Sequence, residues 1–390
     1  MRFARWQMAT LVVAMLAPSS ALALQLGDPD SLLSIDVHAF ASQGFILTTS
    51  NNYLANDTTH GSFQFSELGL NFTKDLTDRL RLGLQLFAED IGPTGSYNAT
   101  LDWFYVDYRW KDWLGLRVGR VKIPFGLYNE VNDIDSARLP VLLPQSIYPL
   151  ENTHYLLAQT GGELYGYLRL GAAGALDYHA YAGTIFIDTS TLLSSTSAFD
   201  LGSFNVPYLA GGRLMWETPV EGLRVGGSGQ ALRLDVTLVE GGTSTAIQVP
   251  VVLWVASAEY SAHDVLLAAE YSRWYVTDNS SNQALSPDRP QVTSERAYGM
   301  AAYRENKWLQ TGAYFSMLFP DVTERAGPAG RQNDLAATVR FDINPFWLVK
   351  VEGHYMFGTA GLVSSLNDNL PLSSLQERWG VLLLKTTAYF

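Results

Sequence analysis

A two-residue alternation of apolar and polar side chains recurs from Ile35 to the end of the sequence and constrains the fold more than any other feature. Leu80, Leu82, Leu84 and Leu86 share one face of such a segment, and Arg79, Arg81, Gln85 and Glu89 share the other. Residues 161–171 and 347–357 repeat the pattern. Each expected strand has about 9–13 residues, longer than the roughly 5–6 of soluble domains and suited to a tilted membrane strand.

The composition is unusual for a soluble domain. Charged residues make up 16% of the chain, below the roughly 25% of soluble domains, and aromatic residues make up 12%. The best candidate for a transmembrane helix, residues 241–258, begins with polar residues and contains Pro250. Without spanning helices, a membrane protein must be a closed barrel, because hydrocarbon offers no partner for a free backbone group. We therefore expect an all-β fold, a transmembrane antiparallel β-barrel.

Short and long connections alternate along the sequence. Short turns are expected at Asp75–Asp78, Lys111–Asp112, Ala172–Gly174, Pro219–Gly222, Ala262–Asp264, Glu305–Lys307 and Asn344–Pro345. Longer loops are expected near residues 47–60, 90–97, 122–160, 186–206, 235–245, 277–293, 319–332 and 358–374. The seven turns and eight loops predict 16 strands. Short periplasmic turns and longer external loops are typical of an outer-membrane barrel.

Aromatic residues cluster where the expected strands meet the turns, as at Trp110, Trp113, Trp308 and Phe346–Trp347. Such residues favour a membrane interface, where part of each ring is apolar and part can bind water. Packing in an ordinary core is the alternative for any one of them. Their repeated position at strand ends favours the interface.

The N-terminus resembles an export signal. Arg2 and Arg5 precede an uncharged stretch from Trp6 to Ala17, and Ala21–Leu22–Ala23 supplies the small residues of a cleavage site. An N-terminal anchor is the alternative, but the apolar run is shorter than the roughly 20 residues that span a bilayer. We expect Sec-type export, a cleaved signal peptide at 1–23, a periplasmic lead at 24–34 and a barrel at 35–390.

Charge and cysteine content exclude several functions. The net charge is -12. Removing residues 1–23, with two arginines and no acidic residue, makes it more negative still, and so acidic a chain is a poor partner for nucleic acid. The sequence has no cysteine. Disulfides, thiolate metal sites and cysteine nucleophiles are therefore excluded.

Motifs for catalysis and cofactors are weak. The histidines His38, His60, His154, His179, His263 and His354 form no pair with metal-ligand spacing. The sequence has no G-x-S-x-G elbow and no glycine-rich phosphate loop before a helix. We expect no cofactor, no metal and no enzymatic activity. Two alternatives stay open: a barrel hydrolase that uses His179 or His154, and a soluble secreted all-β protein that binds glycans through its aromatic ends.

The last expected strand runs from Gln376 to Phe390. Leu382, Leu384, Thr386 and Ala388 share the parity of Phe390. Outer-membrane barrels resemble this arrangement, and the resemblance makes the terminal Phe390 an assembly signal. Tyr389 stands next to Phe390 rather than two residues before it, so the pattern leaves its face open.

The segment from Arg117 to Leu127, RVGRVKIPFGL, resembles the phosphate-selective porin O and P group and related sixteen-stranded porins. The resemblance implies a passive diffusion channel in the outer membrane of a Gram-negative bacterium, surrounded by lipid, for small polar or anionic solutes. It also implies a third external loop folded into the lumen, and general porins suggest a homotrimer. The lysine cluster of a phosphate site is not evident in this sequence.

The longest expected connection, residues 123–160, is the third external loop. It contains Pro124, Pro140, Pro144 and Pro149 and an apolar stretch at Leu139–Leu143. Loops of this length are usually functional or disordered, and the apolar content argues against disorder. Length and resemblance together predict a constriction loop.

Charged residues of this loop and of the lumen wall are the candidate selectivity residues. The loop acids are Glu130, Asp133, Asp135 and Glu151, and the expected pore-lining cations are Arg79, Arg81, Arg109, Arg117, Lys122, Arg138, Arg169, Arg213, Arg340 and Lys350. Facing each other across the pore, they would create a transverse field that sets ion preference. Alternatively, the cations pair with Glu89, Asp107, Glu163, Glu217 and Glu352 and only hydrate the lumen. Alternation places Arg120 toward lipid, so a bulge or a position beyond the hydrocarbon is expected there.

Overall fold

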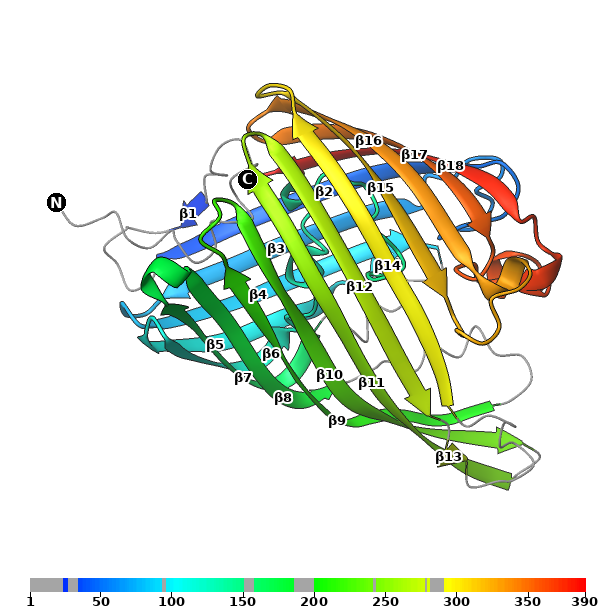
Figure 1. Cartoon of the computed structure of the whole chain (residues 1–390), viewed down its shortest axis with the longest axis horizontal. Helices are drawn as coiled ribbons and strands as arrows, with labels where there is room; N and C mark the ends of the chain where they lie inside the picture. Colours follow the sequence, from blue (N-terminus) through cyan, green and yellow to red (C-terminus); the bar gives the residue numbers. More distant parts are fainter. Residues whose placement is uncertain are drawn as a thin grey trace.

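The computed structural model describes residues 24–26, 34–92, 96–150, 158–185, 200–240, 243–277, 279–280 and 291–390. In this part of the chain 16 antiparallel strands form a closed barrel (Figure 1). Each strand pairs with its neighbour in the sequence, and β18 (Arg378–Tyr389) closes the ring on β2 (Ile35–Thr48). The expected fold class is confirmed. The signal peptide falls at residues 1–23, outside the described residues, and stays a prediction.

The other barrel strands are β3 (Phe65–Asp75), β4 (Leu80–Ile91), β5 (Thr100–Lys111), β6 (Leu114–Lys122), β7 (Ala158–Arg169), β8 (Ala175–Ile185), β9 (Asp200–Glu217), β10 (Leu223–Glu240), β11 (Thr243–Ala262), β12 (Val265–Thr277), β14 (Gln291–Arg304), β15 (Leu309–Phe319), β16 (Gln332–Asn344) and β17 (Trp347–Gly358). Short β1 (Leu24–Leu26) pairs with the start of β2, and β13 (Asn279–Ser280) pairs with β11. Helical structure in the described residues is limited to the 3₁₀ turns η2 (Asn129–Val131), η3 (Asp135–Ala137), η5 (Gly171–Ala173), η6 (Pro328–Gly330), η7 (Ser364–Leu366) and η8 (Leu372–Ser374). No helix among these residues could cross a bilayer.

The turns and loops follow the expected alternation with two corrections. Each short turn lies where the sequence places it, at one end of the barrel. The loop expected at 235–245 is wrong, because β10 continues to Glu240 and β11 begins at Thr243. β-branched residues such as Val236 and Thr237 favour strand, and a glycine pair at 241–242 suits a tight hairpin. The loop expected at 186–206 also ends earlier, since β9 begins at Asp200.

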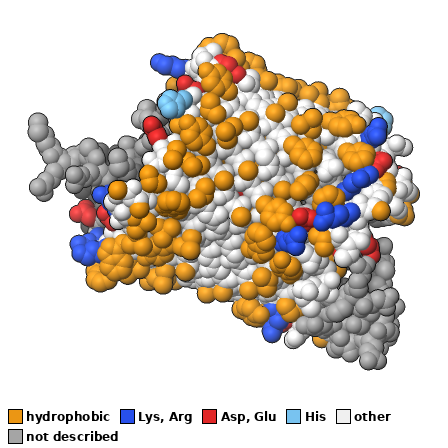
Figure 2. Space-filling model, viewed as in Figure 1, with side chains coloured by type: hydrophobic (Ala, Val, Ile, Leu, Met, Phe, Trp, Pro, Cys, Tyr) orange, Lys and Arg blue, Asp and Glu red, His pale blue; other side chains and the backbone are white. Residues whose placement is uncertain are grey.

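The two faces of the barrel differ in the way the alternation predicts. Leu164 is 47% exposed on the outside, whereas its neighbour Glu163 is 1% exposed inside. Trp347 is 43% exposed, and Lys350 is fully buried on the inner side. Apolar side chains cover much of the outer surface (Figure 2). Such a surface suits hydrocarbon better than water.

Large aromatic side chains are exposed at the strand ends beside the short turns. Trp110, Trp113, Trp308 and Phe346 lie there and are exposed on the outside. This placement matches a membrane-interface belt rather than core packing.

The C-terminus closes the barrel beside the start of β2. The backbone N–H of Phe390 donates to the Ala39 carbonyl, and the Ala39 N–H donates to the Phe390 carbonyl. Phe390 itself is exposed on the outer face together with Leu382 and Leu384. Tyr389 has the opposite parity and shares the inner face with Lys385 and Thr387, which answers the question that the sequence left open.

Candidate functional site: the lumen and its loop

The connection between β6 and β7, residues 123–157, is called the lumen loop here, and the structure describes residues 123–150 of it. Figure 1 shows it in cyan and green inside the ring of strands. Phe125, Val141 and Ile147 on the loop are at most 1% exposed. The third of the long connections, between β6 and β7, therefore occupies the lumen.

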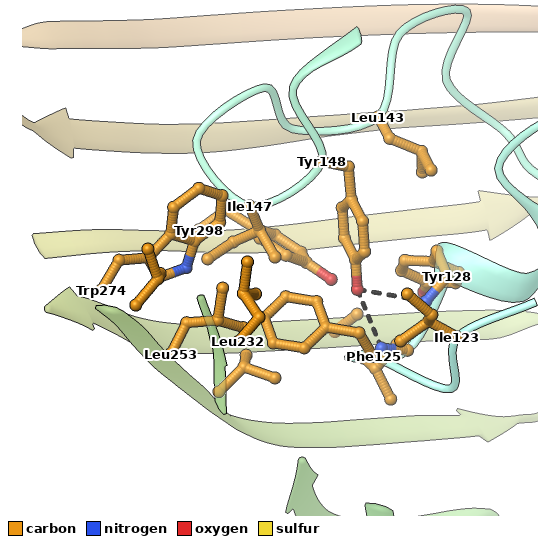
Figure 3. Close-up of a cluster of buried hydrophobic side chains, with 14 of the residues drawn as sticks. Ile123, Phe125, Tyr128, Leu143, Ile147, Tyr148, Leu232, Leu253, Trp274 and Tyr298 are labelled. Atoms are coloured by element: carbon orange, nitrogen blue, oxygen red, sulfur yellow. Dashed lines mark hydrogen bonds between the residues drawn. The ribbon is translucent and has the colours of Figure 1, made fainter. Parts of the chain in front are cut away.

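One side of the loop packs on an apolar part of the wall (Figure 3). Loop residues Ile123, Phe125, Leu143, Ile147 and Tyr148 contact a cluster that includes Leu232, Leu253, Trp274, Tyr298 and Met300 from β10, β11, β12 and β14. A second cluster places Val141 and Leu142 against Ile46, Phe65, Trp379 and Leu383. Part of the lumen wall is therefore apolar. Burying the apolar surface of the loop stabilises it inside the barrel.

The Pro-Phe-Gly motif begins the loop and explains its path. Phe125 is buried in the first apolar cluster. Gly126 has φ +62°, a left-handed conformation that favours glycine. A Cβ at this position would lie 2.4 Å from Tyr148 Oη and 2.8 Å from Glu270 Oε1. Gly126 therefore lets the loop backbone approach the wall closely.

Glu270 on β12 binds both limbs of the lumen loop. Its carboxylate accepts the Leu127 N–H at 3.0 Å and the Tyr148 hydroxyl. It also accepts hydroxyls from Tyr298 at 2.8 Å and Ser257 at 2.6 Å. Tyr148 Oη in turn accepts the Leu127 N–H at 2.8 Å and the Tyr128 N–H at 3.1 Å, and Figure 3 shows Tyr148 beside Tyr128. A single buried carboxylate thus ties the loop's start to its later part.

The opposite wall binds the loop through its backbone. Glu352 on β17 accepts the N–H groups of Val141 at 2.7 Å and Leu142 at 2.9 Å. Arg340 on β16 donates to the carbonyls of Ser136 at 2.8 Å and Arg138 at 3.3 Å. Carboxylates therefore hold loop amides, and a guanidinium holds loop carbonyls.

Asp135 is the most heavily paired acid of the loop. It accepts Lys350 Nζ at 2.9 Å and Thr387 Oγ1 at 2.7 Å, and Lys385 Nζ lies at 3.5 Å. Burial alone would raise the pKa of Asp135, but Lys350, Lys385 and Arg138 hold it well below its usual range. Lys350 also donates to the carbonyls of Asp135 and Arg138.

Two further loop acids pair with the wall near β6 and β9. Glu130 lies 2.6 Å from Arg213 on β9, and Asp133 binds Lys122 and Gln85. Burial acts to raise the pKa of Glu130, but the charges of Arg213, His179 and Arg117 lower it to about 2. Glu151 lies outside the described residues.

These pairs change the expected electrostatics. The sequence places the loop acids across a gap from wall cations, with a field between them. Glu130, Asp133 and Asp135 instead contact their cations directly. The charges therefore anchor the loop, because direct pairing leaves little uncompensated field.

The remaining candidate cations lie along β3–β8 at the short-turn end. Arg117 is 3.1 Å from Asp107 and 3.3 Å from Glu163, and its guanidinium lies over the Tyr165 ring. Arg81 pairs with Asp75, and Arg109 lies 3.4 Å from Asp112. The lining of a cavity of about 140 Å³ includes Arg79, Arg81, Arg109, Arg117, Tyr165 and Asp177. Arg169, at the end of β7, is exposed and outside this lining.

Arg138 and Arg120 donate to backbone carbonyl groups and lie outside the lining of this cavity. Arg138 is 6% exposed, and its guanidinium donates to the Pro140 carbonyl of its own loop. Arg120 donates to the Asp102 carbonyl on β5, beside a register shift in the β4–β5 pairing. The irregularity expected near Arg120 therefore lies in the neighbouring strands.

The sequence did not predict several of the wall residues that contact the lumen loop. Glu270, Glu352 and Lys385 were not among the expected site residues. Inward parity was the available signal: Lys385 stands between inward Leu383 and Thr387, and Glu352 alternates with Lys350. Arg296, an inward arginine of β14, was missed in the same way.

His179 and His354 each contact two carboxylates. His179 Nδ1 contacts Glu163, its Nε2 lies 3.2 Å from Asp177, and His354 lies between Asp334 and Glu352. Among the described residues no group of three acidic or histidine side chains is placed to hold a metal.

No family model matches the chain, and no curated protein matches it. Among solved structures, OmpT of Vibrio cholerae is similar with a TM-score of 0.59 at 11% identity, over 94% of this chain and 100% of that chain. A trimer form of the same protein gives a TM-score of 0.56 at 10% identity, over 91% and 99% of the two chains. The anion-selective porin from Comamonas acidovorans gives 0.52 at 10% identity, over 92% and 99%.

The shared feature is the fold. This chain has the fold of outer-membrane barrels. The narrower resemblance to the phosphate-selective porin O and P group is not confirmed by these comparisons.

Proposed function

We propose that this protein is an outer-membrane porin, a passive diffusion channel narrowed by its third external loop. One observation carries the proposal: a loop held inside the lumen by carboxylates and cations of the surrounding wall. A barrel with an apolar outside and a fixed internal loop has the parts that a selective pore needs. Lipid contacts its outer face.

The permeation route follows the polar wall of β3–β8. This wall lines the cavity of about 140 Å³ that contains Arg81, Arg109 and Arg117. The loop's apolar contacts lie mainly on the other side, with β9–β15. Small polar or anionic solutes suit a passage lined by guanidinium and hydroxyl groups.

Phosphate selectivity has weaker support. Lys350 on β17 and Lys385 on β18, the buried lysines of the described wall, both lie against Asp135. A paired lysine offers little charge to a passing phosphate. We therefore propose general passage of small polar or anionic solutes.

A catalytic role has no supporting observation, and we propose that the protein is not an enzyme. His179, the candidate base of a barrel hydrolase, has carboxylate partners at both ring nitrogens. Within the described residues, the ring nitrogens of His179 contact Glu163, Asp177 and Arg213, and none of these is a nucleophilic hydroxyl. His154 lies outside the described residues.

A homotrimer is proposed from the likeness to a barrel solved in trimer form. Chemical cross-linking of the folded protein in detergent, with a heat-denatured sample as control, tests this state. If cross-linking yields only a band of one subunit's mass, the homotrimer is contradicted.

Purified folded protein in a planar lipid bilayer tests the channel itself. Stepwise conductance is expected, and reversal potentials in a salt gradient report the ion preference. Folded protein that produces no steps would overturn the proposed function. Fractionation is a further check, because recovery without detergent would exclude the membrane barrel.

A further inference from the structure

One wall of the lumen stays apolar beyond the lumen loop, toward the end with the long connections. Phe204, Leu234, Val249 and Val276, on β9, β10, β11 and β12, pack against the first apolar cluster and remain partly exposed. Leu234 and Val249 are direct partners in the β10–β11 pairing. These four residues are called the apolar wall.

Arg296 on β14 lies at the edge of this surface. Its guanidinium stacks over the Trp274 ring, 3.5 Å from the ring centre. Nε donates to Ser294 Oγ at 3.1 Å, and one terminal nitrogen donates to the Ser146 carbonyl of the lumen loop at 2.9 Å. The indole ring and these two acceptors fix the position of the guanidinium, and the residue remains partly exposed.

Arg296 differs from the other inward arginines in its partners. Arg117, Arg213 and Arg340 each lie beside a carboxylate. Arg296 has no ion pair with any residue in the described ranges. No carboxylate of the described residues therefore compensates its positive charge in the lumen, and its second terminal nitrogen has no partner among these residues.

We propose that the apolar wall and Arg296 form a binding site for amphipathic carboxylates that enter the channel. The carboxylate binds the Arg296 guanidinium, and the apolar part of the molecule lies against Val276, with Val249 and Leu234 farther along the same wall. This inference rests on the proposed channel function and narrows its class of solutes. The positive charge of Arg296 favours an anion, and the apolar wall favours a solute with an apolar group attached to that anion.

The dimensions suit a small solute. Arg296 pairs with Ser272 on β12, but its guanidinium lies over Trp274, two residues and therefore about 7 Å along the strand from Val276. An aromatic or medium-chain acid can therefore reach from Arg296 to Val276, and Val249 and Leu234 continue the apolar surface beyond it. Acetate has the carboxylate but no apolar group, and an alcohol of the same length has the apolar group but no charge.

The competing explanation is that Arg296 only supports the loop through the Ser146 carbonyl. The two explanations differ in what a probe molecule does. A supporting role predicts no dependence on an added carboxylate, whereas a binding site predicts saturable block of the ion current.

The test uses the full-length folded protein in planar bilayers and three probes: 3-phenylpropanoate, acetate and 3-phenylpropanol. We expect 3-phenylpropanoate to block the chloride current at a concentration at least about tenfold below that of either control. Calorimetry of the same probes in detergent gives a binding constant that does not depend on conduction.

Two variants locate the site. In Arg296→Gln, the concentration of 3-phenylpropanoate for half block should rise by about tenfold or more, because a charged hydrogen bond is lost. Arg325→Gln is the matched control, since Arg325 also stacks on an aromatic ring, Phe319, but pairs with Glu295 on the outer surface. Its block should equal that of the natural protein.

Outcomes for the site and for the channel are separable. If the natural protein conducts but 3-phenylpropanoate acts no better than acetate, the site is overturned and the channel stands. If Arg296→Gln binds the probe normally by calorimetry, the site is also overturned. Absence of conductance in the natural protein overturns the channel, and calorimetry then still decides whether Arg296 binds the probe.

Discussion

Glu270 on the barrel wall accepts the backbone N–H of Leu127 at 3.0 Å, and the same carboxylate accepts the hydroxyl of Tyr148. Leu127 lies near the start of the lumen loop, and Tyr148 lies about twenty residues later. The loop is therefore closed on itself through the wall. One buried acid, surrounded by the apolar cluster, therefore helps to hold both limbs of the loop.

Replacing Glu270 should release both limbs of the loop. Glu270→Leu leaves the hydroxyls of Tyr148, Tyr298 and Ser257 without their carboxylate acceptor, at about 1–3 kcal/mol for each buried group. We expect faster cleavage of the loop by added protease and a larger, noisier single-channel conductance. Glu305→Gln, in an exposed turn, is the control. Conductance and cleavage equal to those of the control would contradict this role.

Gly126→Ala should disturb the same contact from the loop side. The added Cβ would meet Tyr148 Oη and Glu270 Oε1, and the left-handed backbone is strained for alanine. The two costs together should be about 1–3 kcal/mol or more. Gly327→Ala is a useful comparison, because Gly327 has φ +76° but open space around its Cβ position. Thermal unfolding of both variants in detergent separates the clash from the backbone strain.

A double-mutant cycle measures the pair of Asp135 and Lys350. Asp135→Asn leaves Lys350 and Lys385 near an uncharged partner, and Lys350→Met leaves Asp135 with less compensation. Breaking a buried pair costs about 3–5 kcal/mol in each single variant. The double variant should lose less than the sum, so the coupling energy is favourable. Strictly additive losses would mean that the two charges act independently.

The charge of Glu130 should hold the loop across neutral and mildly acidic pH. Its pKa falls from the ordinary 4.5 to about 2 in the folded protein. A lowered folded pKa adds stability that is complete above pH 4.5 and is lost as the pH falls toward 2. Single-channel conductance should therefore stay constant from pH 8 to about 5 and change below about 4.5. Glu130→Gln should remove this part of the acid response, and an unchanged response would assign it to other groups.

The alternation of side chains along the strands predicts which residues of much of the barrel wall face the lumen. Alternation alone places Glu163 and Lys350 inside and Leu164 outside, because a strand turns successive side chains to opposite faces. It fails on β11, where Val251, Val252 and Leu253 are all apolar and no face can be distinguished. On β10 the alternation is inverted, because Leu232 and Leu234 face the loop inside the barrel and Arg233 lies on the outer face over exposed Tyr208.

The partners of the lumen loop could not be predicted in the same way. Asp135 meets Lys385 only because β18 closes on β2, which brings together residues far apart in the chain. The loop has no repeating backbone, so no period assigns its acids to particular cations. The charges were therefore identified as candidates, but their direct pairing was not.

The C-terminal residue offers the last prediction. Phe390 bonds to Ala39 through its backbone, while its ring is 38% exposed on the outer face. Phe390→Ala keeps the backbone bonds and removes the ring, which the resemblance to other outer-membrane barrels makes an assembly signal. We expect the yield of heat-modifiable folded barrel in cells to fall several-fold, while refolding of the purified protein in detergent stays close to normal. Phe346→Ala removes an exposed ring near the same end and is the control. An equal loss in both variants would mean that aromatic surface, rather than the terminal position, decides assembly.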